Sequence, residues 1–96
     1  MLGRHLVLTY DYVPDILERR EPYRADHLAA ARERLERGEL LAAGALGDPV
    51  HGAAFVFTGI DRDEVERFVT ADPYVLAGLV TGWRIEPWNV VVAEGS

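Results

Sequence analysis

The chain has 96 residues, a formal net charge of −6 and an apolar fraction of 49%, which indicates one small globular domain spanning residues 1–96. It contains no cysteine, no lysine and no serine before Ser96, which excludes disulfides, thiolate metal sites, Schiff-base chemistry and a Ser-His-Asp hydrolase. The acidic balance and the lack of any apolar run of roughly 18–20 residues predict a cytoplasmic protein with neither a nucleic-acid nor a membrane partner.

The first half of the chain predicts two strands separated by helical segments. Residues 4–12 (RHLVLTYDY) are rich in β-branched and aromatic side chains and predict the first strand. One proline opens a short helical turn over 14–20, and a second starts a helix over 23–37. Residues 39–47 predict the second strand, in which Gly44 suggests a bulge or a close backbone approach.

In the helix over 23–37, where successive residues are rotated by about 100°, six residues fall on one side. This expected buried face consists of Arg24, Ala25, Leu28, Ala31, Arg32 and Leu35. Gly38 follows at the position typical of a helix end.

The second half predicts a strand, a helix and a final strand. The sequence DPVHG is a turn, and residues 53–59 form the third strand. Asp61 and Glu64 have capping-box spacing at the start of a second helix. The apolar stripe of this helix consists of Val65, Phe68 and Val69. Residues 82–94 predict the last strand, and Pro87 marks it as an edge or a kink.

This β-α-β-β-α-β order predicts an α+β, ferredoxin-like fold, with a four-stranded antiparallel sheet and its helices on one face. The runs HLVL, AAFVF and NVVVA are apolar at consecutive positions, so both faces of the sheet are hydrophobic there. Because two helices cover only one face, we expect the other face to pack against a second copy in a homodimer. The alternative is a small monomer in which these runs are short central strands.

His27 and Asp72 are the leading candidates for chemistry. His27 lies about 100° around its helix from Leu28, at the edge of the expected buried face, where a ring is sheltered yet reachable. Asp72 precedes a proline in a brief helix over 72–78, where it has the features of an N-cap. Its second oxygen remains able to accept an imidazole N–H, which would set the tautomer and raise the basicity of the ring. The alternatives are a locally packed histidine and a purely structural cap.

Three arginines gather before His27, at Arg19, Arg20 and Arg24. They are either the solvated end of a helix or a local anion-binding patch on an acidic protein. Four aromatic residues are of a kind that most often belongs to a core or an interface: Trp83, Trp88, Tyr10 and Tyr74. One or two of them are candidates to line a flat pocket, and we select Tyr74 and Trp88.

Metal and phosphate sites have weaker support. His5 and His51 have no metal-ligand spacing to each other or to His27. The sequence GALGDPVHG contains glycines but has neither the following helix nor the lysine of a phosphate loop. We therefore expect neither a metal nor a cofactor.

Four segments resemble the YciI-like (YCII) family, and together they run nearly end to end. They are RREPYRADHL, GELLAAGALGDPVHGAAFVF, ADPYVLAGLV and IEPWNVV. The resemblance implies a ferredoxin-like subunit that pairs into a dimeric α+β barrel, with an active-site His/Asp pair corresponding to His27 and Asp72. The sequence departs from the family at His51, where relatives often carry an acidic residue.

A related chlorinated-hydroquinone dehydrochlorinase suggests proton-abstraction and elimination chemistry for this family. We therefore expect a cofactor-independent lyase or isomerase acting on a small oxygenated cyclic or aromatic molecule. In this hypothesis His27 and Asp72 are catalytic, and Arg24 with Arg20 holds an enolate or carboxylate. Tyr74 and Trp88 would contact the substrate. The alternative is a non-catalytic metabolite-binding or accessory dimer that uses the same pocket.

Overall fold

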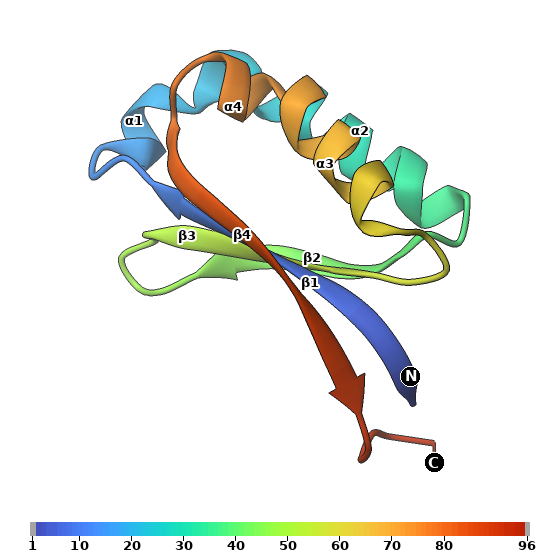
Figure 1. Cartoon of the computed structure of the whole chain (residues 1–96). Coiled ribbons are helices and arrows are strands. Elements are labelled where there is room, and N and C mark those ends of the chain that lie inside the picture. The colour runs from blue at the N-terminus through green and yellow to red at the C-terminus, as the bar shows by residue number, and fades with distance from the viewer. Residues whose placement is uncertain (1, 96) are drawn as a thin grey trace.

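The computed structural model describes residues 2–95 and consists of one four-stranded antiparallel sheet with helices on a single face (Figure 1). The strand order is β2-β3-β1-β4. The strands are β1 (Gly3–Tyr12), β2 (Leu40–Leu46), β3 (Gly52–Phe57) and β4 (Val80–Val90). The helices are α1 (Ile16–Arg19), α2 (Glu21–Glu36), α3 (Arg62–Ala71) and α4 (Pro73–Leu76). The predicted ferredoxin-like fold is therefore confirmed. No helix within residues 2–95 is long and apolar enough to cross a bilayer.

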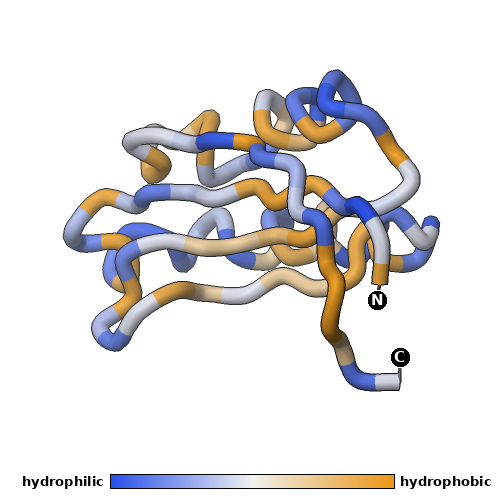
Figure 2. Tube along the Cα trace, turned by 60° about the horizontal axis from the view of Figure 1, so that its bottom comes forward, coloured by the Kyte–Doolittle hydropathy of each residue, from blue (hydrophilic) through white to orange (hydrophobic). Residues whose placement is uncertain are grey.

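The last strand lies earlier in the chain than the predicted 82–94. In the sheet β4 has β1 as its one neighbour, and its ladder ends where Val90 pairs with Gly3, at the start of β1. Val91 and Val92 follow the strand and are highly exposed, although the chain is strongly apolar there (Figure 2). The strand thus ends where its ladder with β1 ends, a limit that its own composition does not reveal. Pro87 lies on an edge strand, as expected.

The expected irregularity at Gly44 is wrong. The pairing of β2 with β3 shifts between Leu40 and Ala42, whereas Gly44 pairs regularly with Ala54. Because β2 is an edge strand, a bulge at its beginning disturbs only one ladder.

The core lies between the sheet and α3. Its aromatic centre is formed by Phe55 and Phe57 of β3, both in edge-on contact with Phe68 of α3. The predicted stripe of Val65, Phe68 and Val69 is buried. Asp61 caps α3 by accepting the Glu64 N–H at 3.0 Å, but the Glu64 side chain turns to Arg34 and Arg67 and does not complete the capping box.

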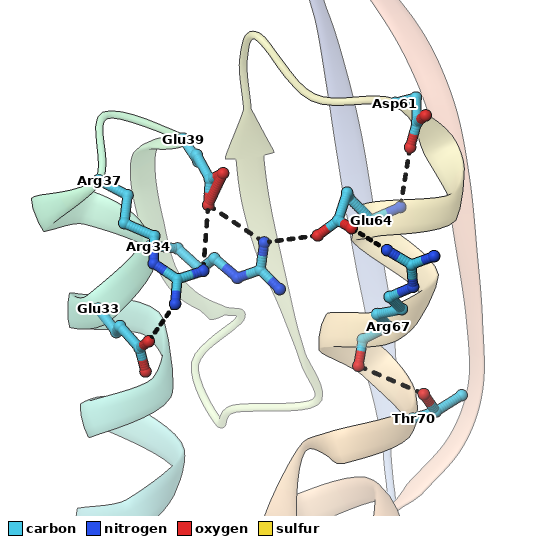
Figure 3. A network of polar contacts seen from close by, with 8 residues as sticks. All are labelled: Glu33, Arg34, Arg37, Glu39, Asp61, Glu64, Arg67 and Thr70. Carbon is cyan, nitrogen blue, oxygen red and sulfur yellow. Dashed lines mark hydrogen bonds and ion pairs between the residues drawn. The ribbon is translucent and has the colours of Figure 1, made fainter.

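A network of charges joins the C-terminal half of α2 to α3 (Figure 3). The Arg34 guanidinium bonds Glu39, just before β2, at 3.1 Å and Glu64 of α3 at 3.3 Å. Partial burial of Arg34 protects these contacts from solvent screening. The network fixes the spacing of the two helices and so helps to seat α2 on the sheet.

The predicted buried face of α2 is confirmed at Ala31, half-buried at Leu28 and wrong at its other four residues. The buried residues of α2 are His27 and Ala31, whereas Arg24, Ala25, Arg32 and Leu35 are exposed. Apolar side chains are spread around this helix, so its hydrophobic pattern does not select one face. The face is selected instead by contacts of the His27 ring and by the small Ala31, which lets the helix approach the sheet.

We expect Ala31→Leu to lower the free energy of unfolding by about 1–3 kcal/mol, because the larger side chain overpacks the contact between α2 and the sheet. Ala29→Leu is the matched control on the exposed side of the same helix and should change stability by less than about 0.5 kcal/mol. Urea unfolding followed by circular dichroism measures both. Equal losses in the two variants would contradict the assigned face.

Candidate active site

Asp72 is buried at the junction of α3 and α4, with 1% of its surface exposed. Its extended backbone ends α3, and its Oδ1 accepts the Tyr74 N–H at 3.0 Å, which caps α4. Pro73 occupies the first turn of α4, where a missing N–H costs nothing. The Asp-Pro-Tyr segment therefore turns the chain between two helices and directs a carboxylate into the protein.

The Asp72 carboxylate meets the His27 ring, 45 residues earlier in the chain. His27 Nδ1 lies 2.8 Å from Asp72 Oδ1 and 3.0 Å from Oδ2. The Tyr10 hydroxyl donates to Oδ2 at 2.8 Å. Because an ionised carboxylate only accepts, this contact assigns the proton of the neutral ring to Nδ1 and leaves Nε2 as the basic nitrogen.

Aromatic contacts hold the imidazole in one orientation. The Tyr74 ring stacks on it with centroids 3.8 Å apart and planes 5° from parallel. The Phe55 ring meets it edge-on at 6.1 Å. Tyr74 thus acts twice, because its backbone N–H holds Asp72 while its ring covers one face of His27. The ring is clamped before any ligand arrives.

A hollow of about 250 Å³ opens beside this ring, between α2, β2 and α4. Its lining consists of Tyr12, Arg20, Arg24, His27, Leu28, Ala31, Ala43, Gly44, Ala45, Ala53, Phe55 and Tyr74. Within residues 2–95, His27 Nε2 has no hydrogen-bond partner. A lining histidine with Nδ1–H held and Nε2 available has the arrangement of a general base.

The hollow carries positive charge. Arg20 and Arg24 both line it, and neither guanidinium makes an ion pair or a hydrogen bond with any residue among 2–95. No Asp or Glu is among the lining residues, although acidic residues outnumber basic ones 16 to 10 in the sequence. Unpaired guanidiniums facing a cavity favour a ligand with a carboxylate, enolate or phenolate oxygen.

The tyrosines around the pair stay protonated. Burial is the main cause that raises the pKa of Tyr10, and the Asp72 charge adds to it. Burial also raises the pKa of Tyr12, with a further contribution from Tyr74. For Tyr74 burial raises the pKa, while Arg20 and Arg24 oppose that rise. Each phenol therefore remains a hydrogen-bond donor near neutral pH.

Four of the six predicted site residues line this hollow, namely His27, Arg20, Arg24 and Tyr74, and a fifth, Asp72, lies behind His27 and bonds its ring. Trp88 is not among them. It lines a separate depression on the other face of the sheet, with Val7, Ala54 and Val56, because side chains along β4 alternate between the faces. His51 lies in an exposed turn and does not line the hollow. No group of three metal-ligating side chains occurs within residues 2–95.

Sequence reasoning did not consider Tyr12 for the site and gave Tyr10 no role in it. Tyr12 lines the hollow, and Tyr10 reaches Asp72 from the middle of the sheet. Both follow Leu8 along β1 at two-residue spacing, which places them on the same, helix-facing side. A buried phenol needs a hydrogen-bond partner, so the position of Tyr10 was the available signal.

A family model described as a YCII-related domain matches residues 4–89. The chain belongs to this family. No curated protein matches the YCII chain in sequence.

Solved structures share the fold of this YCII protein. One is the 5-chloro-2-hydroxyhydroquinone dehydrochlorinase TftG of Burkholderia phenoliruptrix AC1100, in complex with 2,5-dihydroxybenzoquinone. It is 24% identical with a TM-score of 0.74, over 88% of this chain and 93% of that one. PA3566 of Pseudomonas aeruginosa is 15% identical with a TM-score of 0.52, over 96% and 97% of the two chains. At these identities the likeness concerns the fold.

We expect Asp72→Asn to lower the free energy of unfolding by about 2–3 kcal/mol, because an amide offers one acceptor oxygen and turns its NH₂ toward Tyr10 or His27. Asp61→Asn is the matched control at an exposed N-cap and should cost less than about 0.5 kcal/mol, since Asn caps as well as Asp. Chemical denaturation compares the two variants. A similar, small loss in both would contradict a structural demand for the buried carboxylate.

Proposed function

We propose that this protein is a cofactor-independent lyase or isomerase that acts on a small oxygenated cyclic or aromatic molecule. One observation carries the proposal. A clamped imidazole with an available Nε2 and two unpaired guanidiniums line the same hollow of about 250 Å³. A hollow below the usual 300–1,000 Å³ range of ligand pockets favours a single-ring ligand.

In this proposal His27 is the general base and Asp72 its orienting partner. Nε2 removes a proton from the substrate, and the Asp72 carboxylate stabilises the imidazolium that forms. Arg24 and Arg20 hold the oxygen on which negative charge develops, a role that suits planar guanidinium donors. Tyr74 contacts the ring of the substrate at the wall of the hollow.

Two reactions follow from such a proton transfer. In an elimination, the electron pair released by the departing proton expels a leaving group, such as halide, through the conjugated ring. In an isomerisation, the same proton returns to another atom of the substrate. Neither reaction needs an external oxidant or reductant, so an acid–base pair and an anion site are sufficient. The likeness in fold to TftG, whose name describes a dehydrochlorinase, supports the elimination.

We expect His27→Gln to lower kcat/KM by about 10²- to 10⁴-fold, because the substitution removes the base. Chloride release from 5-chloro-2-hydroxyhydroquinone is the measurement, and His51→Gln is the matched control, since His51 does not line the hollow. Unchanged turnover in His27→Gln would refute the assignment. Calorimetric binding of 2,5-dihydroxybenzoquinone by the unmodified protein without any turnover would favour the metabolite-binding alternative.

We also propose that two copies pack sheet to sheet. The face of the sheet away from the helices carries a largely apolar depression, and 43% of the Trp88 surface is exposed there. Its lining consists of Val7, Ala54, Val56, Glu86, Pro87 and Trp88. An exposed pair of opposite charges, Arg84 and Glu86, lies on β4. A two-fold arrangement buries the apolar residues and lets such charges pair between copies.

We expect Val56→Glu to convert a dimer to a monomer, because it places an unpaired carboxylate in the apolar centre of the proposed interface. Sedimentation velocity on the purified protein measures the change. Leu76→Glu, at a highly exposed position of α4 on the helix side, is the control and should leave the assembly unchanged. A monomeric unmodified protein would refute the dimer and leave the small-monomer alternative.

A further inference from the structure

We propose that Tyr10 is a positioning residue for the His27–Asp72 pair, one whose hydroxyl fixes the carboxylate and limits how strongly that carboxylate retains a proton on His27. The effect on turnover rests on the proposed function, whereas the effect on the pair itself does not. Tyr10 touches neither the hollow nor a ligand, so it would act entirely through Asp72.

Tyr10 and His27 share one oxygen of the Asp72 carboxylate, and on that oxygen the Tyr10 contact is the shorter. Oδ2 receives the Tyr10 hydroxyl at 2.8 Å and His27 Nδ1 at 3.0 Å. Oδ1 receives His27 Nδ1 at 2.8 Å and the Tyr74 N–H at 3.0 Å. Removing the hydroxyl therefore leaves Oδ2 with only the longer contact to His27. A buried carboxylate oxygen that loses a donor binds its remaining donor more strongly.

The surroundings of Tyr10 hold its side chain in one position, so its hydroxyl can in turn hold the Asp72 carboxylate. It is fully buried on β1, an interior strand paired on both sides through Ala53 and Trp83. Its ring packs edge-on against Phe55 with centroids 4.9 Å apart. Burial and the Asp72 charge raise the pKa of Tyr10, so its hydroxyl stays a donor across the working pH range. The sheet thus anchors a carboxylate that lies between two helices.

The sign of the effect follows from the charge of the pair. With a neutral imidazole the pair carries one negative charge, and with an imidazolium it carries none. The Tyr10 donor stabilises the negative state more, so its loss favours proton uptake. The other titratable or charged groups around His27 are Arg20, Arg24, Tyr12 and Tyr74, and Tyr10→Phe leaves all of them in place.

The test is a pH titration of the histidine rings by ¹⁵N NMR. The His27 signals are assigned as those that are missing from the spectrum of His27→Gln. Tyr10→Phe should raise the titration midpoint of the pair by about 0.5–1 pH unit. In turnover assays the pH at the midpoint of the acid limb of the kcat/KM profile should rise by the same amount. Tyr23→Phe, an exposed phenol on α2 outside the hollow, is the matched control and should move neither.

If Tyr10 has only a structural role, Tyr10→Phe lowers the free energy of unfolding without moving the titration midpoint of the pair. An unchanged midpoint in folded Tyr10→Phe therefore overturns the proposal. The NMR readout needs no substrate, so it stands even if His27→Gln retains full turnover and the proposed function fails. If Tyr10→Phe does not fold, the unmodified protein provides the test. Its Tyr10 hydroxyl proton should appear in slow exchange with water, and rapid exchange overturns the proposal.

Discussion

The structure depends on one buried carboxylate. Asp72 accepts from the Tyr10 hydroxyl of the sheet, from the His27 ring of α2 and from the Tyr74 N–H of α4. A buried charge without such donors would cost several kcal/mol, so the three elements are held in one arrangement. The interaction that assembles the fold at this point is also the one that orients the candidate base.

This constraint explains an unusual helix. An ordinary surface helix is oriented by an apolar stripe, but α2 presents an imidazole and a single buried alanine to the sheet. Leu35 is left half exposed on the same helix. Polar contacts at its N-terminal half and the Arg34 network at its C-terminal half replace the missing stripe. A helix seated in this way keeps its ring in place without closing the space beside it.

Charge is distributed unevenly over the molecule. Most described arginines pair with carboxylates on the surface, as Arg34, Arg62 and Arg67 do. Arg20 and Arg24 remain unpaired beside the hollow, which contains no acidic side chain. An acidic protein thus retains a small cationic hollow, whose planar guanidinium donors suit an anionic oxygen.

The sequence by itself determined the order of the elements, the caps at Asp61 and Asp72 and the stripe of α3, because these depend on neighbours a few residues apart. Helix position and capping chemistry pointed to His27 and Asp72, and the resemblance to the family pointed to the same pair. Only the tertiary structure decided which face of α2 is buried, that Trp88 lies on the other face of the sheet, and that Tyr10 meets Asp72 across 62 residues. Contacts between residues so far apart in the sequence depend on how the elements pack. The periodicity of apolar residues in α2 does not predict its packing, because a polar contact selects the face that is buried. The strand end at Val90 has the same cause, since it was decided by where β1 begins.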